Sequence, residues 1–126
     1  MTLDEIMFFD GHPAALPLYE KLKSNILAEI PEARIEVKKT QISFFARYMF
    51  AAASFTPVRK KKERPEPFLT VTFCLPHRVT ANRIDAAAEP YPGRWTHHVM
   101  IGSAAEVDAE LMDWIREASA FSSGKR

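Results

Sequence analysis

A stripe of apolar side chains marks an amphipathic helix near the start of the chain. From about Ala14 to Ile30, apolar residues recur every four positions, as on one side of an α-helix: Leu18, Leu22, Ile26 and Ile30. A shorter helix is expected before it. Thr2 and Glu5 have the spacing of a capping box at its start, and Gly11 ends it.

After this helix the period of the apolar residues changes from about 3.6 to about 2, which is typical of β-strands. The alternation predicts strands near residues 35–37, 42–44, 48–55, 69–75, 83–89 and 95–101. The connections between most of these strands are short, which favours antiparallel neighbours because a parallel pair needs a long crossover. A meander is the simplest topology.

The end of the chain predicts a second amphipathic helix. Ser103 and Glu106 have the spacing of a capping box, and the apolar residues after them fall on one face: Val107, Leu111, Trp114, Ile115 and Ala118. The fold class is therefore α+β. We expect one domain over residues 1–126, a two-layer sandwich in which N-terminal and C-terminal helices cover an antiparallel meander sheet of about five to six strands.

Two segments are expected to lie outside this core. Residues 57–67 hold a basic run flanked by prolines and have too few apolar side chains to pack inside, so we predict an exposed, mobile hairpin loop. Residues 122–126 are polar, and we predict a flexible tail.

Composition narrows the functional classes. The chain has 17 basic and 16 acidic residues, so no global field favours a polyanion or an anionic membrane surface. Its single cysteine, Cys74, lies in an alternating strand and is expected to be a packed thiol in a reducing cytoplasm. We find no secretory signal at the N-terminus and no apolar run long enough for a membrane span. A soluble, cytoplasmic protein without membrane contact is expected.

Three segments carry a family resemblance: Lys38–Phe44, Pro90–Val99 and Glu106–Ile115. In their order and spacing they resemble the domain of unknown function DUF5655, over nearly the whole chain. The resemblance implies a small bacterial-type α+β domain that occurs alone or attached to other domains. It implies no established activity.

The adjacent histidines His97 and His98 are the first candidates for chemistry, because histidine is the commonest metal ligand and titrates near neutral pH. Neighbouring side chains on a strand point to opposite faces. We therefore expect His97 to face the helices and His98 the other side, and we predict no metal site and no cofactor.

Cationic and polar residues near strand ends suggest instead a site for an anionic ligand, since arginine grips phosphate or carboxylate in bidentate fashion. The expected ligand-binding residues are Lys39, Gln41, Arg47, Arg94, His97 and His98. The leading hypothesis is a non-enzymatic module that binds a small anionic ligand or a protein partner, as a monomer or a homodimer.

Two alternatives stay open. One is an enzyme that uses His97 for general acid/base chemistry on a small substrate, although no motif identifies catalytic residues. The other is a nucleic-acid accessory domain that acts through the basic loop, whose cationic residues are Arg59, Lys60, Lys61, Lys62 and Arg64.

Overall fold

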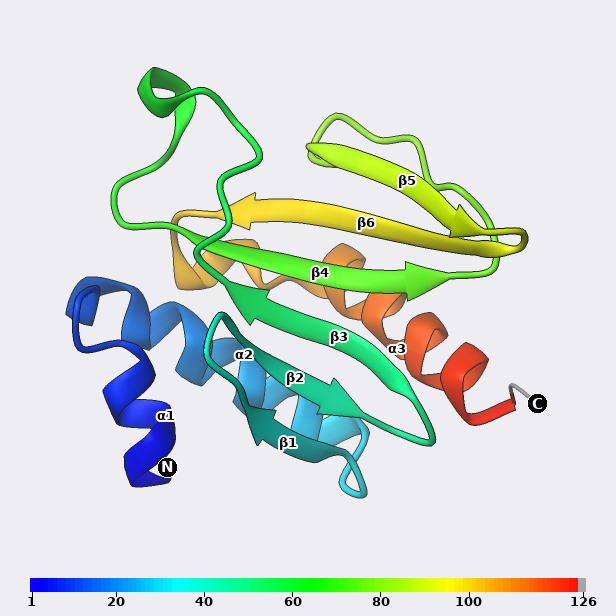
Figure 1. Cartoon of the computed structure of the whole chain (residues 1–126), viewed down its shortest axis with the longest axis horizontal. Coiled ribbons are helices and arrows are strands. Elements are labelled where there is room, and N and C mark those ends of the chain that lie inside the picture. Colours follow the sequence, from blue (N-terminus) through cyan, green and yellow to red (C-terminus); the bar gives the residue numbers. More distant parts are fainter. Residues whose placement is uncertain (125–126) are drawn as a thin grey trace.

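The computed structural model describes residues 1–124 as a twisted antiparallel sheet with helices (Figure 1). The helices are α1 (Leu3–Phe8), α2 (Leu16–Glu29) and α3 (Ala109–Gly124). The strands are β1 (Arg34–Val37), β2 (Gln41–Phe45), β3 (Met49–Ser54), β4 (Leu69–Leu75), β5 (Ala86–Tyr91) and β6 (Arg94–Ile101). Short 3-10 helices occupy Pro13–Ala15, Lys61–Glu63 and Ala104–Glu106.

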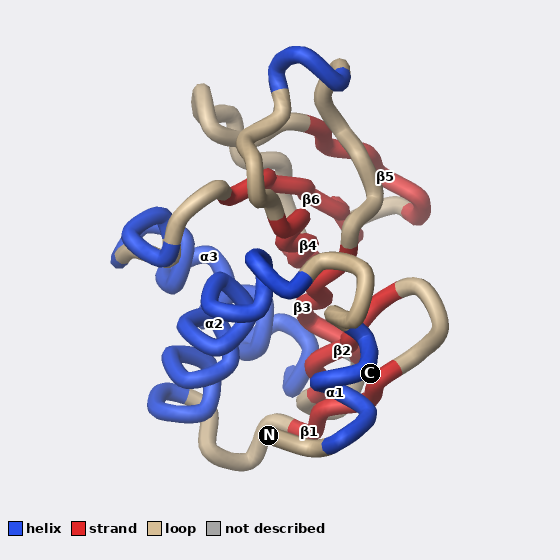
Figure 2. Tube along the Cα trace, turned by 90° about the vertical axis from the view of Figure 1, so that its left-hand side faces the viewer, coloured by secondary structure: helices blue, strands red, loops and turns tan. Residues whose placement is uncertain are grey.

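The six strands have the spatial order β1-β2-β3-β4-β6-β5, and every neighbouring pair is antiparallel. The first four strands form a meander, whereas β6 lies between β4 and β5. Helices α2 and α3 lie together on one face of the sheet (Figures 1 and 2). The predicted α+β architecture, with an antiparallel sheet covered by N-terminal and C-terminal helices, is confirmed.

The core lies between the sheet and this pair of helices. Alternate residues of β4 face it and are buried, namely Leu69, Val71, Phe73 and Leu75. The apolar stripe of α2 and the apolar face of α3 pack against them, with Leu22, Ile26, Leu111 and Ile115 all fully buried. The spacing that predicted each element therefore also determines which side of it packs between the sheet and the helices.

Helix α1 sits at the end of the sheet, outside the α2–α3 layer (Figure 2). Its capping box is confirmed: the Glu5 N–H donates to Thr2 Oγ1 (3.2 Å), and the Thr2 N–H donates to Glu5 Oε1 (2.7 Å). The buried Glu5 carboxylate also accepts hydrogen bonds from Tyr19 and from Lys23 (3.0 Å). Burial alone would raise the pKa of Glu5, but these bonds lower it to about 2. Glu5 thereby joins α1 to α2.

The predicted start of the C-terminal helix is wrong by about one turn. The Ser103 side chain makes no capping bond, and the Glu106 carboxylate accepts the Gly102 N–H at 2.7 Å. Instead Asp108 Oδ1 accepts the Leu111 N–H at 3.0 Å at the start of α3. Asp108 also binds Arg83 (2.7 Å), which draws residue 83 into the loop before β5, so that this strand begins later than predicted.

The predicted tail 122–126 is structured at its start. Ser122 belongs to α3 and is buried, and its hydroxyl bonds to both backbone groups of Tyr48. Residues 125–126 lie outside the described residues. Within residues 1–124, no helix combines the length and the apolar character required to cross a membrane.

Candidate functional site

The face of the sheet turned away from α2 and α3, here called the open face, faces the viewer in Figure 1. Across its middle, paired residues form a row from β2 to β5: Ser43, Ala52, Thr72, His98 and Ala86. These side chains are small or polar, in contrast to the apolar residues on the helix side. Ser43 and Ala52 are buried, whereas Thr72, His98 and Ala86 are partly exposed, so a ligand could reach this row on β4, β6 and β5.

Arg94 and His98 lie on this open face, on the same side of β6. The Arg94 guanidinium points toward Cys74, with Nη2 3.4 Å from Sγ. Cys74 pairs with Thr96, and the next row along the strands pairs Thr72 with His98. Thr72 Oγ1 and His98 Nδ1 are 2.8 Å apart. The side chains of Arg94, Thr96, Thr72 and His98 therefore lie in adjacent rows on the open face. These four residues are here called the β6 cluster.

The members of the β6 cluster have a mixed environment. Arg94, Thr96, Thr72 and His98 are all partly exposed, so solvent and small solutes reach them. Burial lowers the pKa of His98, so its imidazole is neutral at pH 7. The permanent charge of the cluster is therefore that of Arg94, and His98 contributes hydrogen bonding.

His97, the neighbouring residue, is fully buried on the helix side, as expected from strand alternation. Its ring stacks on Phe73 at 5.0 Å and accepts the Val79 N–H at Nε2 (2.9 Å). Nδ1 is buried, and no described residue meets it in hydrogen-bonding geometry. Burial lowers the pKa of His97, which a backbone interaction with Phe73 only partly offsets. A substrate cannot reach this ring, and its role is in packing.

The other predicted ligand-binding residues do not join Arg94 and His98. Lys39 lies in the β1–β2 turn, at the opposite end of the sheet from Arg94. Gln41 is three strands from β6, about 14 Å away at ordinary strand spacing, and donates to Ser43 at 2.7 Å. Arg47 lies in the β2–β3 turn, over the ring of Tyr48. The predicted convergence of all six residues on one anion is not present.

The basic loop is held to the sheet by Arg59, and Arg64 bonds within the loop. Arg59 Nε lies 2.8 Å from Asp85 Oδ1, and Nη2 donates to the Met100 carbonyl at 3.3 Å. Arg64 in turn donates to the Arg59 carbonyl at 2.8 Å. The remaining bases, Lys60, Lys61 and Lys62, are exposed. Of the predicted nucleic-acid-binding residues, only these three lysines are classed as exposed to solvent.

Two pockets that the sequence did not predict lie at the end of the sheet near α1. Two cavities of about 300 and 550 Å³ flank His12, whose ring stacks on Phe55 with a centroid distance of 4.0 Å. Phe8 and Phe68 also contact Phe55. The aromatic residues were visible in the sequence, but their gathering depends on long-range packing between α1 and the segment after β3.

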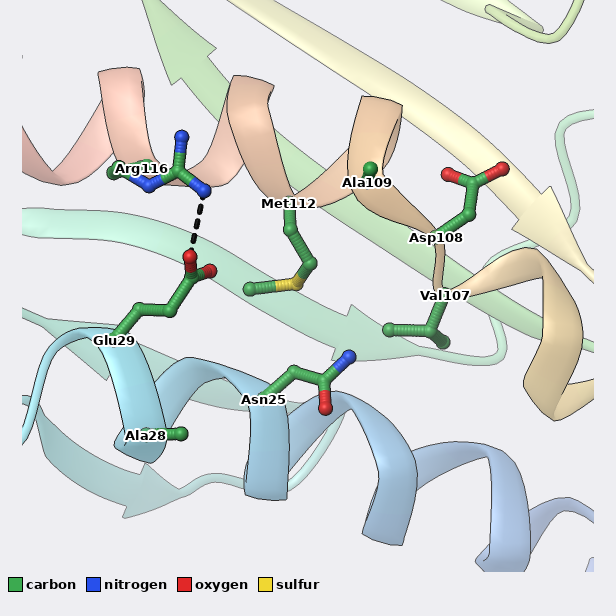
Figure 3. A pocket seen from close by; sticks show the side chains of 8 residues that line it. All are labelled: Asn25, Ala28, Glu29, Val107, Asp108, Ala109, Met112 and Arg116. Atoms are coloured by element: carbon green, nitrogen blue, oxygen red, sulfur yellow. Dashed lines mark hydrogen bonds and ion pairs between the residues drawn. The ribbon is translucent and has the colours of Figure 1, made fainter.

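A further cavity, of about 320 Å³, lies between α2 and α3 (Figure 3). Arg116 of α3 and Glu29 of α2 form an ion pair of 2.6 Å across it. Asp108 at its other end caps α3 and binds Arg83. The Arg116–Glu29 pair therefore joins the two helices, and Asp108 joins α3 to the loop before β5. Nowhere in residues 1–124 do three or more His, Cys, Asp or Glu side chains gather in a group that could hold a metal ion.

Comparison with known proteins identifies the family but no activity. Residues 7–122 match the model of the family described as "Domain of unknown function (DUF5655)". No curated protein and no solved structure matches the chain. Because the match spans nearly the whole chain, from α1 to the last turns of α3, this protein belongs to the DUF5655 family.

Proposed function

We propose that the protein is a non-enzymatic binding module that takes a small anionic ligand on its open face, at the β6 cluster. One observation carries this proposal: the Arg94 guanidinium is turned inward along the sheet, toward Cys74, in the row next to Thr72 and His98. Arginine in such a position offers a fork of N–H donors that fits phosphate or carboxylate.

The neighbouring groups support an oxyanion rather than a cation. The Thr96 hydroxyl can donate a hydrogen bond, the bonded pair of Thr72 and His98 keeps one further proton to donate, and Arg94 supplies the charge. The net charge of +1 adds no general attraction for polyanions, so binding depends on these local groups. We also propose a cytoplasmic location, since Cys74 is a buried free thiol.

An enzymatic role through His97 has less support than binding. General acid/base catalysis requires a ring within hydrogen-bond reach of the substrate. His97 is fully buried on the helix side, and its Nε2 already accepts a backbone N–H. It therefore cannot exchange a proton with a ligand on the open face. His98 is the more accessible of the two histidines, and its ring bonds to the Thr72 hydroxyl rather than to a carboxylate.

Thermal denaturation with and without phosphate, sulfate or citrate tests this proposal, because a ligand of the native state raises the melting temperature. We expect a rise for the unaltered protein that is lost in Arg94→Gln. Arg47→Gln is the matched control, since it removes the same charge from the same end of the sheet. Equal responses in both variants would contradict the proposal. Salt-sensitive oligonucleotide binding through Lys60, Lys61 and Lys62 would favour the nucleic-acid alternative.

A further inference from the structure

We propose a second ligand site, independent of the β6 cluster, in the cavities that flank His12, and we infer that it takes a small aromatic carboxylate. The larger cavity, of about 550 Å³, is lined by α1, the β1–β2 turn and the segment after β3. Its size falls within the range of small-molecule sites in proteins. It lies at the end of the sheet opposite Arg94.

The walls of this cavity suit a planar apolar group. Phe55 and Phe8 stack with a centroid distance of 5.6 Å and an interplanar angle of 17°, and His12 stacks on Phe55 at 4.0 Å and 22°. Met7 adds a polarizable thioether and is 63% exposed. Aromatic ligands gain both apolar burial and offset stacking on such surfaces.

The charge that lines the cavity is positive and uncompensated. Lys39 forms no ion pair or hydrogen bond within residues 1–124. The adjacent Lys38, by contrast, lies 3.9 Å from Glu36 and over the Phe45 ring. The Thr40 hydroxyl beside Lys39 is likewise without a partner in the described chain, and Thr56 uses only its backbone groups. An ammonium group and two hydroxyls thus remain available to a carboxylate.

The smaller cavity, of about 300 Å³, indicates how the ligand would be oriented. It shares Gly11 and His12 with the larger one and is lined by Glu66, Pro67 and Phe68. Glu66 is exposed and makes no ion pair with the described residues, so its negative charge repels a carboxylate from this side. The carboxylate therefore points toward Lys39, and the ring lies against His12 and Phe55.

The test is an NMR titration of the full chain with 2-naphthoate, using 2-naphthol as the uncharged probe of the same ring. We expect 2-naphthoate to shift the amide signals of His12, Lys39 and Phe55 and to bind about tenfold more tightly than 2-naphthol, as one charge-assisted hydrogen bond would provide. Lys39→Met should abolish that preference. Lys38→Met is the matched control and should retain it.

Other outcomes would overturn the inference. Equal affinities for the two probes, or equal affinities of the two lysine variants for 2-naphthoate, would remove Lys39 from the site. Signal changes around Arg94 and His98 instead of His12 would show that the carboxylate prefers the β6 cluster. Both lysines are exposed, and an unchanged amide spectrum in the absence of ligand establishes that each variant folds.

Discussion

His97 and His98 are neighbours in the chain, yet they lie in two different environments. His97 faces α3, is fully buried, and has a backbone N–H and the Phe73 ring as partners. His98 lies on the open face, is partly exposed, and has the Thr72 hydroxyl as its partner. The same side-chain chemistry thus serves packing on one face and is available for binding on the other.

The two faces differ because they are covered differently. On the helix side, side chains of β4 and β6 fill the space under α3, and polar atoms there must find partners inside the protein. On the open face, the paired residues of the middle strands are small or polar except for Met100. The two faces therefore differ in the chemistry of their side chains more than in burial, since Ser43, Thr70 and Cys74 on the open face are buried as well. Three predictions follow from the comparison.

The largest expected effect is a difference in stability between substitutions at two adjacent residues of β4, one on each face of the sheet. Phe73→Ala should lower the free energy of unfolding by about 3–5 kcal/mol, because a buried ring that packs on His97 and Trp114 is replaced by a cavity. Thr72→Ala should cost about 1 kcal/mol, the worth of its hydrogen bond to His98. Urea denaturation measures both values. Similar losses in the two variants would mean that the open face is as tightly packed as the core.

The fold was predictable from the sequence because alternation and helical spacing each determine a buried face. The alternating run of β4 and the four-residue spacing of α2 identified the buried residues before any contact was known. The order of the last two strands was less accessible. The connection between β4 and β5 passes on the helix side of β6, where Val79 meets His97, and no local pattern encodes that path.

The predicted six-residue site failed for a reason of geometry. Successive hairpin turns of a meander lie at alternating ends of the sheet, so Lys39 in the first turn and Arg47 in the second must be apart. Arg94 lies at the Arg47 end, because β6 starts beside the end of β4. The cavities at His12 escaped prediction for another reason: they require residues from α1 and from the segment after β3 to pack together.

An intermediate effect is expected where the basic loop crosses to the end of β6. A methyl group on Gly102 would come within 2.4 Å of Pro65 Cβ, so Gly102→Ala should lower the free energy of unfolding by about 1–3 kcal/mol. Gly11→Ala is the control, because no atom lies within 4 Å of the added carbon there. Urea denaturation compares the two. Equal stability of both variants would show that the basic loop shifts to accommodate the added methyl group and is not fixed against the sheet.

The smallest expected effect concerns pH and returns to the two histidines. Burial lowers the pKa of His97 in the folded protein below its ordinary value of 6.5. As the pH falls through 6.5, the unfolded chain binds a proton that the folded protein does not, so stability decreases; well above 6.5 neither state binds the proton and nothing is lost. The slope for one histidine is at most about 1.4 kcal/mol per pH unit.

Substitution of each histidine separates the contributions. His97→Gln should flatten the loss of stability between pH 6.5 and 5 more than His98→Gln does, although burial lowers the pKa of both rings. The reason is that protonated His97 would also lose the hydrogen bond that its Nε2 accepts from Val79, whereas partly exposed His98 can turn to solvent. Urea denaturation at several pH values measures the slopes. If His98→Gln reduced the pH dependence of stability more than His97→Gln, protonation of His98 on the open face would be the more unfavourable of the two.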